Sequence, residues 1–115
     1  MQDLSVKVLS DVIHFMKYAK YLPEQNRRET WVETVTRNME MHIKKYPSLK
    51  KEIGNSYAYV YDKKVLPSMR SMQFGGKPIE LNPARGYNCA FMHASDWEFF
   101  PELMFLLLGG SGVGY

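Results

Sequence analysis

Cys89 is the residue of this 115-residue chain best suited to redox or nucleophilic chemistry. It lies in the apolar run Tyr-Asn-Cys-Ala-Phe at positions 87–91. A cysteine in such a run is either a small core residue or a redox-active thiol, which needs a second cysteine within disulfide reach. Because the sequence has no second cysteine, it excludes an internal disulfide framework and a cysteine-based zinc site. Both interpretations of Cys89 stay open on these residues alone.

A glycine-rich segment, residues 109–114, is the second candidate. Its amides could surround an anion, because glycine permits a close approach of the backbone to a ligand. No lysine follows with the spacing of a Walker loop, and the segment follows a predicted helix, whereas a dinucleotide-binding fingerprint follows a strand. A tight turn and a ligand-binding loop are equal alternatives for this segment.

The remaining polar candidates favour structural roles. His14, His42 and His93 are far apart, and no pair of them has the spacing of metal ligands. Ser68 has no histidine nearby in the sequence, so a hydrolase nucleophile is not indicated. The eight methionines are typical of adaptable core filling.

Composition indicates an ordinary globular chain with enough apolar residues for one small domain. Hydrophobic residues make up 45% and charged residues 23%. The net charge of +3 is too small to predict a nucleic-acid partner, and the basic residues come as separated pairs. No apolar run reaches the roughly 18 residues of a membrane helix, so we expect no membrane partner.

The first part of the chain, residues 1–66, has a helical pattern. Ser10 and Asp11 are predicted to start a helix, because a serine hydroxyl can accept from the free amides of a first turn. Leu22-Pro23 is predicted to end it, since a residue before proline avoids the helical conformation.

Two further helices are predicted in this part. Thr30 and Glu33 form a capping box for a helix that stops before Pro47. Ser48 is predicted to open the next helix. Tyrosines alternate with smaller residues over positions 57–61, so a short strand is a possible alternative there.

The second part, residues 67–115, contains seven of the eight glycines. Residues 75–78 are predicted to form a turn, and residues 86–93 a buried strand. Asp96 is predicted to cap a helix that runs to Leu108 and is apolar nearly all round, which is typical of a buried helix. Strand, helix and glycine-rich segment together predict the opening of an α/β unit. The apolar end after that segment leads us to expect a piece of a larger protein.

Four stretches, taken in order, resemble ribonucleotide reductases, and specifically the adenosylcobalamin-dependent (class II) ribonucleoside-triphosphate reductases. The spacing of 23 residues between Cys89 and Gly112 also fits that family. The stretches are YAKYLP with RRETW and ETV at 18–35, LPSMRSM with GG at 66–76, GYNC at 86–89 and GSGVGY at 110–115.

The resemblance implies an α/β fold. This chain would supply the N-terminal helices (residues 1–66) and then, in residues 67–115, the first strand and helix of a ten-stranded catalytic barrel. The family replaces the ribose 2′-hydroxyl by hydrogen through thiyl-radical chemistry, which provides deoxyribonucleotides for DNA synthesis. Cys89 matches the first of two redox-active cysteines that become a disulfide. Ser68, Asn88, Ser111 and Gly112 match motifs that contact the substrate nucleotide.

The resemblance also implies partners that this chain does not contain. They are a ribonucleotide substrate, the remainder of the barrel, adenosylcobalamin bound by that remainder, and a thioredoxin-type reductant, all in the cytoplasm. The thiyl-radical cysteine and the second redox cysteine are absent, so we expect no turnover by this chain alone. A class I catalytic subunit and a small helical binding module are the alternatives. The module would have a self-contained core and a polar C-terminus.

Overall fold

The chain is mixed in secondary structure and mostly helical over residues 3–115, which the computed structural model describes. Short 3₁₀ turns join several of the elements. The helices are α1 (Leu4–Lys17), α2 (Trp31–Lys45), α3 (Lys50–Tyr61), α4 (Met69–Phe74), α5 (Lys77–Leu81) and α6 (Phe99–Leu108), and the strands are β1 (Tyr21–Leu22), β2 (Arg27–Arg28), β3 (Cys89–Phe91) and β4 (Gly112–Gly114).

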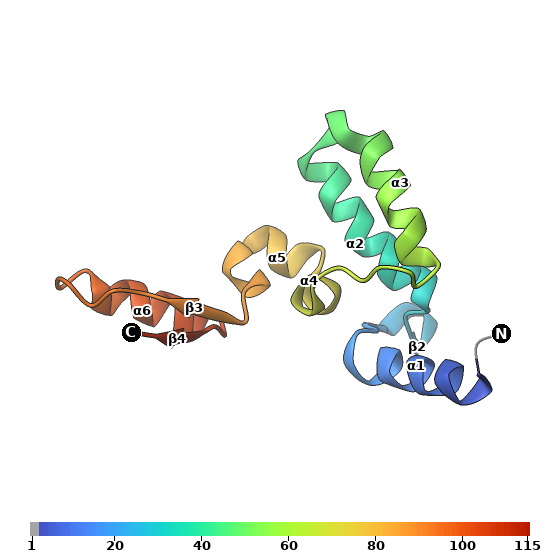
Figure 1. Ribbon diagram of the computed structural model, residues 1–115, viewed down its shortest axis with the longest axis horizontal. Coiled ribbons are helices and arrows are strands. Elements are labelled where there is room, and N and C mark those ends of the chain that lie inside the picture. Colours follow the sequence, from blue (N-terminus) through green and yellow to red (C-terminus); the bar gives the residue numbers. More distant parts are fainter. Residues whose placement is uncertain (1–2) are drawn as a thin grey trace.

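The molecule is elongated. Its Cα radius of gyration is 17.1 Å and its extents are 55 × 36 × 33 Å, whereas a compact chain of this length has a radius of about 13 Å. Figure 1 shows why: α2 and α3 lie side by side near α1, while β3, α6 and β4 extend away from them beyond α4 and α5. Helices α1, α2 and α3 therefore form one end of the molecule, and the β3–α6–β4 unit forms the other.

Helix α1 begins and ends earlier than the sequence predicted. The carboxylate of Asp3 accepts a hydrogen bond from the amide of Ser5 (3.3 Å), so the helix starts at Leu4, and the prediction of a start at Ser10 was wrong. It ends at Lys17, because the next residues pair as β1 with β2 in a short antiparallel hairpin.

Helix α2 confirms the predicted capping box. The hydroxyl of Thr30 accepts from the amide of Glu33 (3.3 Å), and the Glu33 carboxylate accepts from the amide of Thr30 (2.7 Å). Arg27 adds a bidentate ion pair to Glu33 and, with the bonds from Thr30, lowers the pKa of that exposed carboxyl to about 2. The helix ends at Lys45, before Pro47, as predicted.

Residues 57–61 are helical, so the alternative of a strand there was wrong. Helix α3 begins at Lys50, after a 3₁₀ turn that includes Ser48, and not at Ser48 itself. Tyr57 and Val60 are three residues apart and both are buried, which is the spacing of one helix face.

The main core lies where α2, α3 and α4 meet. Val35, Tyr57, Val60 and Met72 form it. Asn38 is fully buried beside them and donates to the backbone oxygen (2.6 Å) and the hydroxyl (2.7 Å) of Ser71. Its own oxygen accepts from the hydroxyl of Tyr57, whose pKa burial raises to about 12. Polar groups in this core are thus paired with one another.

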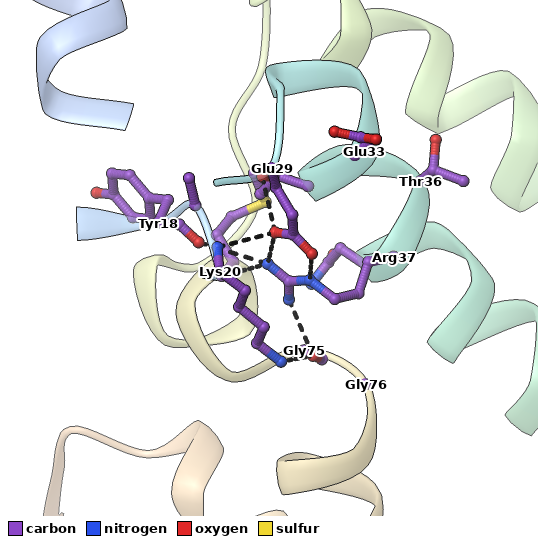
Figure 2. Close-up of polar contacts among 12 residues, drawn as sticks. Tyr18, Lys20, Glu29, Glu33, Thr36, Arg37, Gly75 and Gly76 are labelled. Carbon is purple, nitrogen blue, oxygen red and sulfur yellow. Dashed lines mark hydrogen bonds and ion pairs between the residues drawn. The ribbon is translucent and has the colours of Figure 1, made fainter. Parts of the chain in front are cut away.

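A buried ion pair between Glu29 and Arg37 joins the N-terminal segments to the later ones (Figure 2). Arg37 Nε and Nη2 lie 2.8 and 2.9 Å from the two carboxylate oxygens. The same guanidinium donates to the carbonyl oxygens of Met72 (3.1 Å) and Gly75 (2.9 Å). Burial raises the pKa of the Glu29 carboxyl, but the bonds from Arg37, Lys20 and Thr34 outweigh that effect and lower it.

The predicted turn at residues 75–78 is present at its first two positions, Gly75 and Gly76, while Lys77 already begins α5. Gly76 has a φ of +88°, which favours glycine. A Cβ atom at Gly75 would lie 2.6 Å from the carbonyl oxygen of Ser71, so only glycine fits against α4 there.

The C-terminal end is a β–α–β unit in which β3 and β4 are parallel neighbours and α6 connects them. Of the strand predicted at residues 86–93, only Cys89–Phe91 is a strand. The predicted helix begins at Phe99, three residues after Asp96, so the prediction that Asp96 caps it was wrong. A strand, β4, begins within the glycine-rich segment, at Gly112.

Burial of this unit was predicted wrongly. Along β3, Cys89 and Phe91 are exposed, and α6 exposes most of its apolar side chains. Their hydropathy is that of buried elements, but within residues 3–115 nothing covers them. The exposed large apolar residues of α6 are Phe100, Met104, Phe105, Leu107 and Leu108. None of the described helices has the length and apolar composition that crossing a membrane requires.

Loss of the Glu29–Arg37 pair is expected to destabilise the chain strongly. Arg37→Met leaves the Glu29 carboxylate buried without its counter-charge, which costs about 3–5 kcal/mol. Urea unfolding measures the change. The matched control is Lys44→Met, which removes an exposed ion pair with Glu80 and costs about 0–1 kcal/mol. Equal losses for the two variants would contradict this role of Arg37.

Protonation of His14 at acid pH is expected to lower the free energy of unfolding. Burial, and next the positive charge of Lys63, lower the pKa of His14 below its ordinary value of 6.5, against the opposite effects of Glu29 and Asp11. The unfolded chain therefore binds a proton at higher pH than the folded chain does, and the stabilisation is lost as pH falls below about 6.5.

Urea unfolding at pH 8 and pH 5.5 tests this expectation. The free energy of unfolding should fall more in the wild type than in His14→Gln. His93→Gln, at an exposed position, is the control and should keep the wild-type dependence. The same fall in all three proteins would exclude His14 as its cause.

Candidate functional site

The parallel pair of β3 and β4 brings the two sequence motifs with chemical potential together. Cys89 lies directly opposite Gly112, although the two are 23 positions apart in the sequence. The amide of Gly112 donates to the carbonyl oxygen of Asn88 (2.9 Å), and the amide of Met92 donates to that of Gly114 (3.0 Å). The thiol and the glycine-rich segment therefore share one small sheet.

Ser111 holds the start of β4 in place. Its side chain is buried, its hydroxyl donates to the carbonyl oxygen of Tyr87 (3.1 Å), and its amide donates to that of Leu106 (3.0 Å). Gly110 precedes it with a φ of +91°, a conformation that L side chains rarely adopt. The hydroxyl of Ser111 thus supports the loop from within and is not free for a ligand.

Asn88 is linked to α4 by Arg70, which the sequence did not indicate as a site residue. Arg70 Nη2 donates to the side-chain oxygen of Asn88 (2.8 Å), and its guanidinium lies 5.3 Å from the centre of the Phe74 ring. None of the ion pairs among residues 3–115 involves Arg70. The only sequence signal for Arg70 was its place in the LPSMRSM motif.

Ser68 forms no hydrogen bond with β3 or β4 within residues 3–115. It is exposed at the start of α4, and its hydroxyl caps no amide of that helix. Its carbonyl oxygen accepts from the amide of Met72 (3.0 Å). Arg70, two residues after Ser68, makes the hydrogen bond that links this helix to Asn88.

Cys89 is a free and exposed cysteine. This contradicts the expectation of a cysteine in a buried strand. The reason is that β3 has one strand neighbour, β4, and alternates exposed and half-buried positions. An exposed thiol is available for reaction, whereas a core thiol is not.

The histidines fit structural roles at two of three positions. His14 Nε2 lies 2.9 Å from the Thr34 hydroxyl, and His42 Nδ1 lies 2.9 Å from the carbonyl oxygen of Asn38. His93 is exposed. Within residues 3–115, no three His, Cys, Asp or Glu side chains are grouped as metal ligands would be.

The strand pair and Arg70 together offer a thiol, a side-chain amide, a guanidinium and a glycine backbone. An amide and a guanidinium suit the hydroxyl and phosphate oxygens of a sugar phosphate. Glycine keeps the backbone accessible, since no side chain covers it. Comparisons with protein-family models, with curated proteins and with solved structures find no match to this chain.

Cys89 should react in the folded chain. With Ellman's reagent in native buffer, we expect one thiol per chain to react at a rate close to that of the chain unfolded in urea, because the side chain is exposed. Cys89→Ser should give no reaction, which assigns the signal. A thiol that reacts only in urea would show that this end of the molecule is covered.

Proposed function

We propose that this chain is the N-terminal part of an adenosylcobalamin-dependent ribonucleoside-triphosphate reductase. The observation that carries the proposal is the register that sets Cys89 beside Gly112, because each belongs to a separate motif that resembles this family. Two motifs that meet in space support a shared site better than either does in the sequence alone.

In the proposed reaction Cys89 supplies half of the reducing equivalents. Its thiol and a second thiol from the remainder of the enzyme together give up two electrons and two protons and form a disulfide. The ribose 2′ C–O bond breaks, the hydroxyl leaves as water, and a C–H bond takes its place. A thioredoxin-type reductant then restores the two thiols. Cys89 has a free thiol in this chain, and a thiol is the group that both exchange steps require.

The side chains around Cys89 are those that a ribonucleotide would need. The Asn88 amide can bond a ribose hydroxyl or phosphate oxygen, and the amide of a glycine-rich segment can approach the substrate closely. Ser68 is exposed and is the third substrate contact in the proposal. Ser111 acts indirectly, because its hydroxyl is bonded to the backbone of Tyr87 and holds the loop that presents Gly112.

The exposed apolar surface of α6 also favours a larger assembly. Parallel strands occur almost only in sheets that are covered on both faces, and a two-stranded sheet is marginally stable by itself. In the proposal, further strands and helices of an α/β barrel cover β3, β4 and α6. A self-contained helical binding module would not account for an apolar surface at this end.

We assign no residue of this chain to adenosylcobalamin. The groups beside Cys89 are an amide, a guanidinium and glycine backbone, which suit sugar and phosphate oxygens and not the broad face of a corrin ring. In the proposal the remainder of the enzyme binds the cofactor, which supplies radical chemistry.

The test is reductase activity of the enzyme that contains this chain, with adenosylcobalamin, a ribonucleoside triphosphate and a thioredoxin-type reductant. Cys89→Ser should abolish multiple turnover, because no disulfide can form, but should spare radical formation, which is measured by electron paramagnetic resonance. Ser95→Ala, at an exposed position, should keep full activity.

Three results would separate the alternatives. Full steady-state activity of Cys89→Ser would exclude its redox role. Activity without adenosylcobalamin, dependent on a separate radical-generating subunit, would favour the class I alternative. A soluble monomer with no reductase activity in any context would favour the binding module.

A further inference from the structure

A cavity of about 590 Å³ lies between α1 and the segment that leads into α4. This volume is within the roughly 300–1,000 Å³ of small-molecule sites. The lining contains none of Asn88, Cys89, Ser111 and Gly112, and Figure 1 shows α1 at the end of the molecule away from β3 and β4. Pro67 and Met69 do line the cavity, so it borders Ser68.

The walls of this cavity are mostly apolar. Leu9 and Ile13 of α1 line one side, Leu66 and Met69 line another, and Trp31 also contributes. Leu9, Leu66 and Met69 are more than half exposed, at 59%, 65% and 57%. A ligand with an apolar body would remove this surface from water, which favours binding.

The charged groups in the lining are two lysines, Lys7 and Lys63, and no acidic side chain among residues 3–115 lines the cavity. Ser10, His14 and Tyr18 are its uncharged polar residues. Lys63 Nζ lies 5.1 Å from the centre of the Trp31 ring and donates to the Ser10 hydroxyl (2.8 Å). It also pairs with Asp11 (3.3 Å), which lies outside the lining and partly balances its charge. Lys7 is in none of the ion pairs among residues 3–115, so its charge remains to complement an anion.

His14 contributes a neutral polar group and no positive charge. The side chain is 4% exposed, and burial lowers its pKa. The hydroxyl of Thr34 donates its proton to Glu29 (3.1 Å), so His14 Nε2 donates to the Thr34 oxygen (2.9 Å), and Nδ1 of the neutral ring is an acceptor.

The geometry points to a binding site for a small amphipathic organic anion, with an apolar ring or chain between α1 and the Leu66–Met69 wall and one anionic group near Lys63 and Lys7. The apolar walls supply affinity and the lysines select the sign of charge. The site does not depend on the proposed reductase chemistry.

Dye binding tests this site with Trp31 as the reporter. In a Trp97→Phe background Trp31 is the single tryptophan, so energy transfer from it to 8-anilinonaphthalene-1-sulfonate reports binding near the cavity. We expect saturable binding of one dye per chain. Non-saturable binding, as on the exposed surface of α6, would overturn the proposal.

Two neighbouring substitutions on α1 make a matched pair. Leu9→Glu puts a negative charge in the cavity wall and should weaken dye binding at least about tenfold. Val8→Glu changes a residue of similar exposure (54%) outside the lining and should bind the dye as the background does. Met69→Glu is the second cavity variant, to be used if Leu9→Glu lowers the urea midpoint. Equal binding by cavity and control variants would exclude the site.

A neutral dye separates the apolar contribution from the charge contribution. Lys7→Met removes a lysine that is in none of the ion pairs among residues 3–115, and it should weaken binding of the sulfonate but not of N-phenyl-1-naphthylamine, which has the same aromatic body without the anion. If both dyes weaken equally, or neither does, selection by the lysines is wrong.

Discussion

The buried pair of Glu29 and Arg37 is the interaction on which the rest of the structure depends. One guanidinium binds a carboxylate at two points and also two carbonyl oxygens, those of Met72 and Gly75, at the end of α4. Lys20 adds a third donor to the same turn through the Gly75 carbonyl (2.8 Å). Such a pair adds little net stability over apolar packing, but its loss leaves a charge uncompensated. The Glu29–Arg37 pair therefore determines that the end of α4 packs against Glu29 and α2.

The position of α4 follows from this pair, and the position of the candidate site follows from α4. Arg37 and Asn38 hold the backbone of α4, and Arg70 on that helix binds Asn88 at the edge of β3. Beyond this link the β3–α6–β4 unit is extended from the helices and exposes its apolar surface. A larger barrel would bury that surface, and the proposed chemistry needs such a barrel for a second thiol.

Local signals in the sequence predicted the local structure well. The Thr30–Glu33 capping box and the stop before Pro47 were confirmed, since both depend on neighbouring residues only. The start of α1 was wrong because Asp3 caps the helix earlier than Ser10 could. The alternation at residues 57–61 suggested a strand, but packing of Tyr57 and Val60 against α2 favours a helix.

The candidate site was only partly predictable. The sequence motifs identified Cys89, Asn88, Ser111 and Gly112, and the strand register brings them together. The predicted burial of β3 and α6 was wrong, because hydropathy indicates that a surface needs a cover but not whether this chain provides it. Arg70 and the cavity beside α1 were missed, since both depend on contacts between segments distant in the sequence.

The central claim is that Cys89 works with a second cysteine in a barrel to which this chain contributes the first strand. Sequencing the coding DNA beyond the Tyr115 codon tests it most directly. The predicted result is a reading frame, continuous or resumed after an inserted element, that encodes further barrel strands with a central cysteine and a second redox cysteine. A stop codon with no complementary reading frame nearby would contradict the claim and remove the redox role of Cys89.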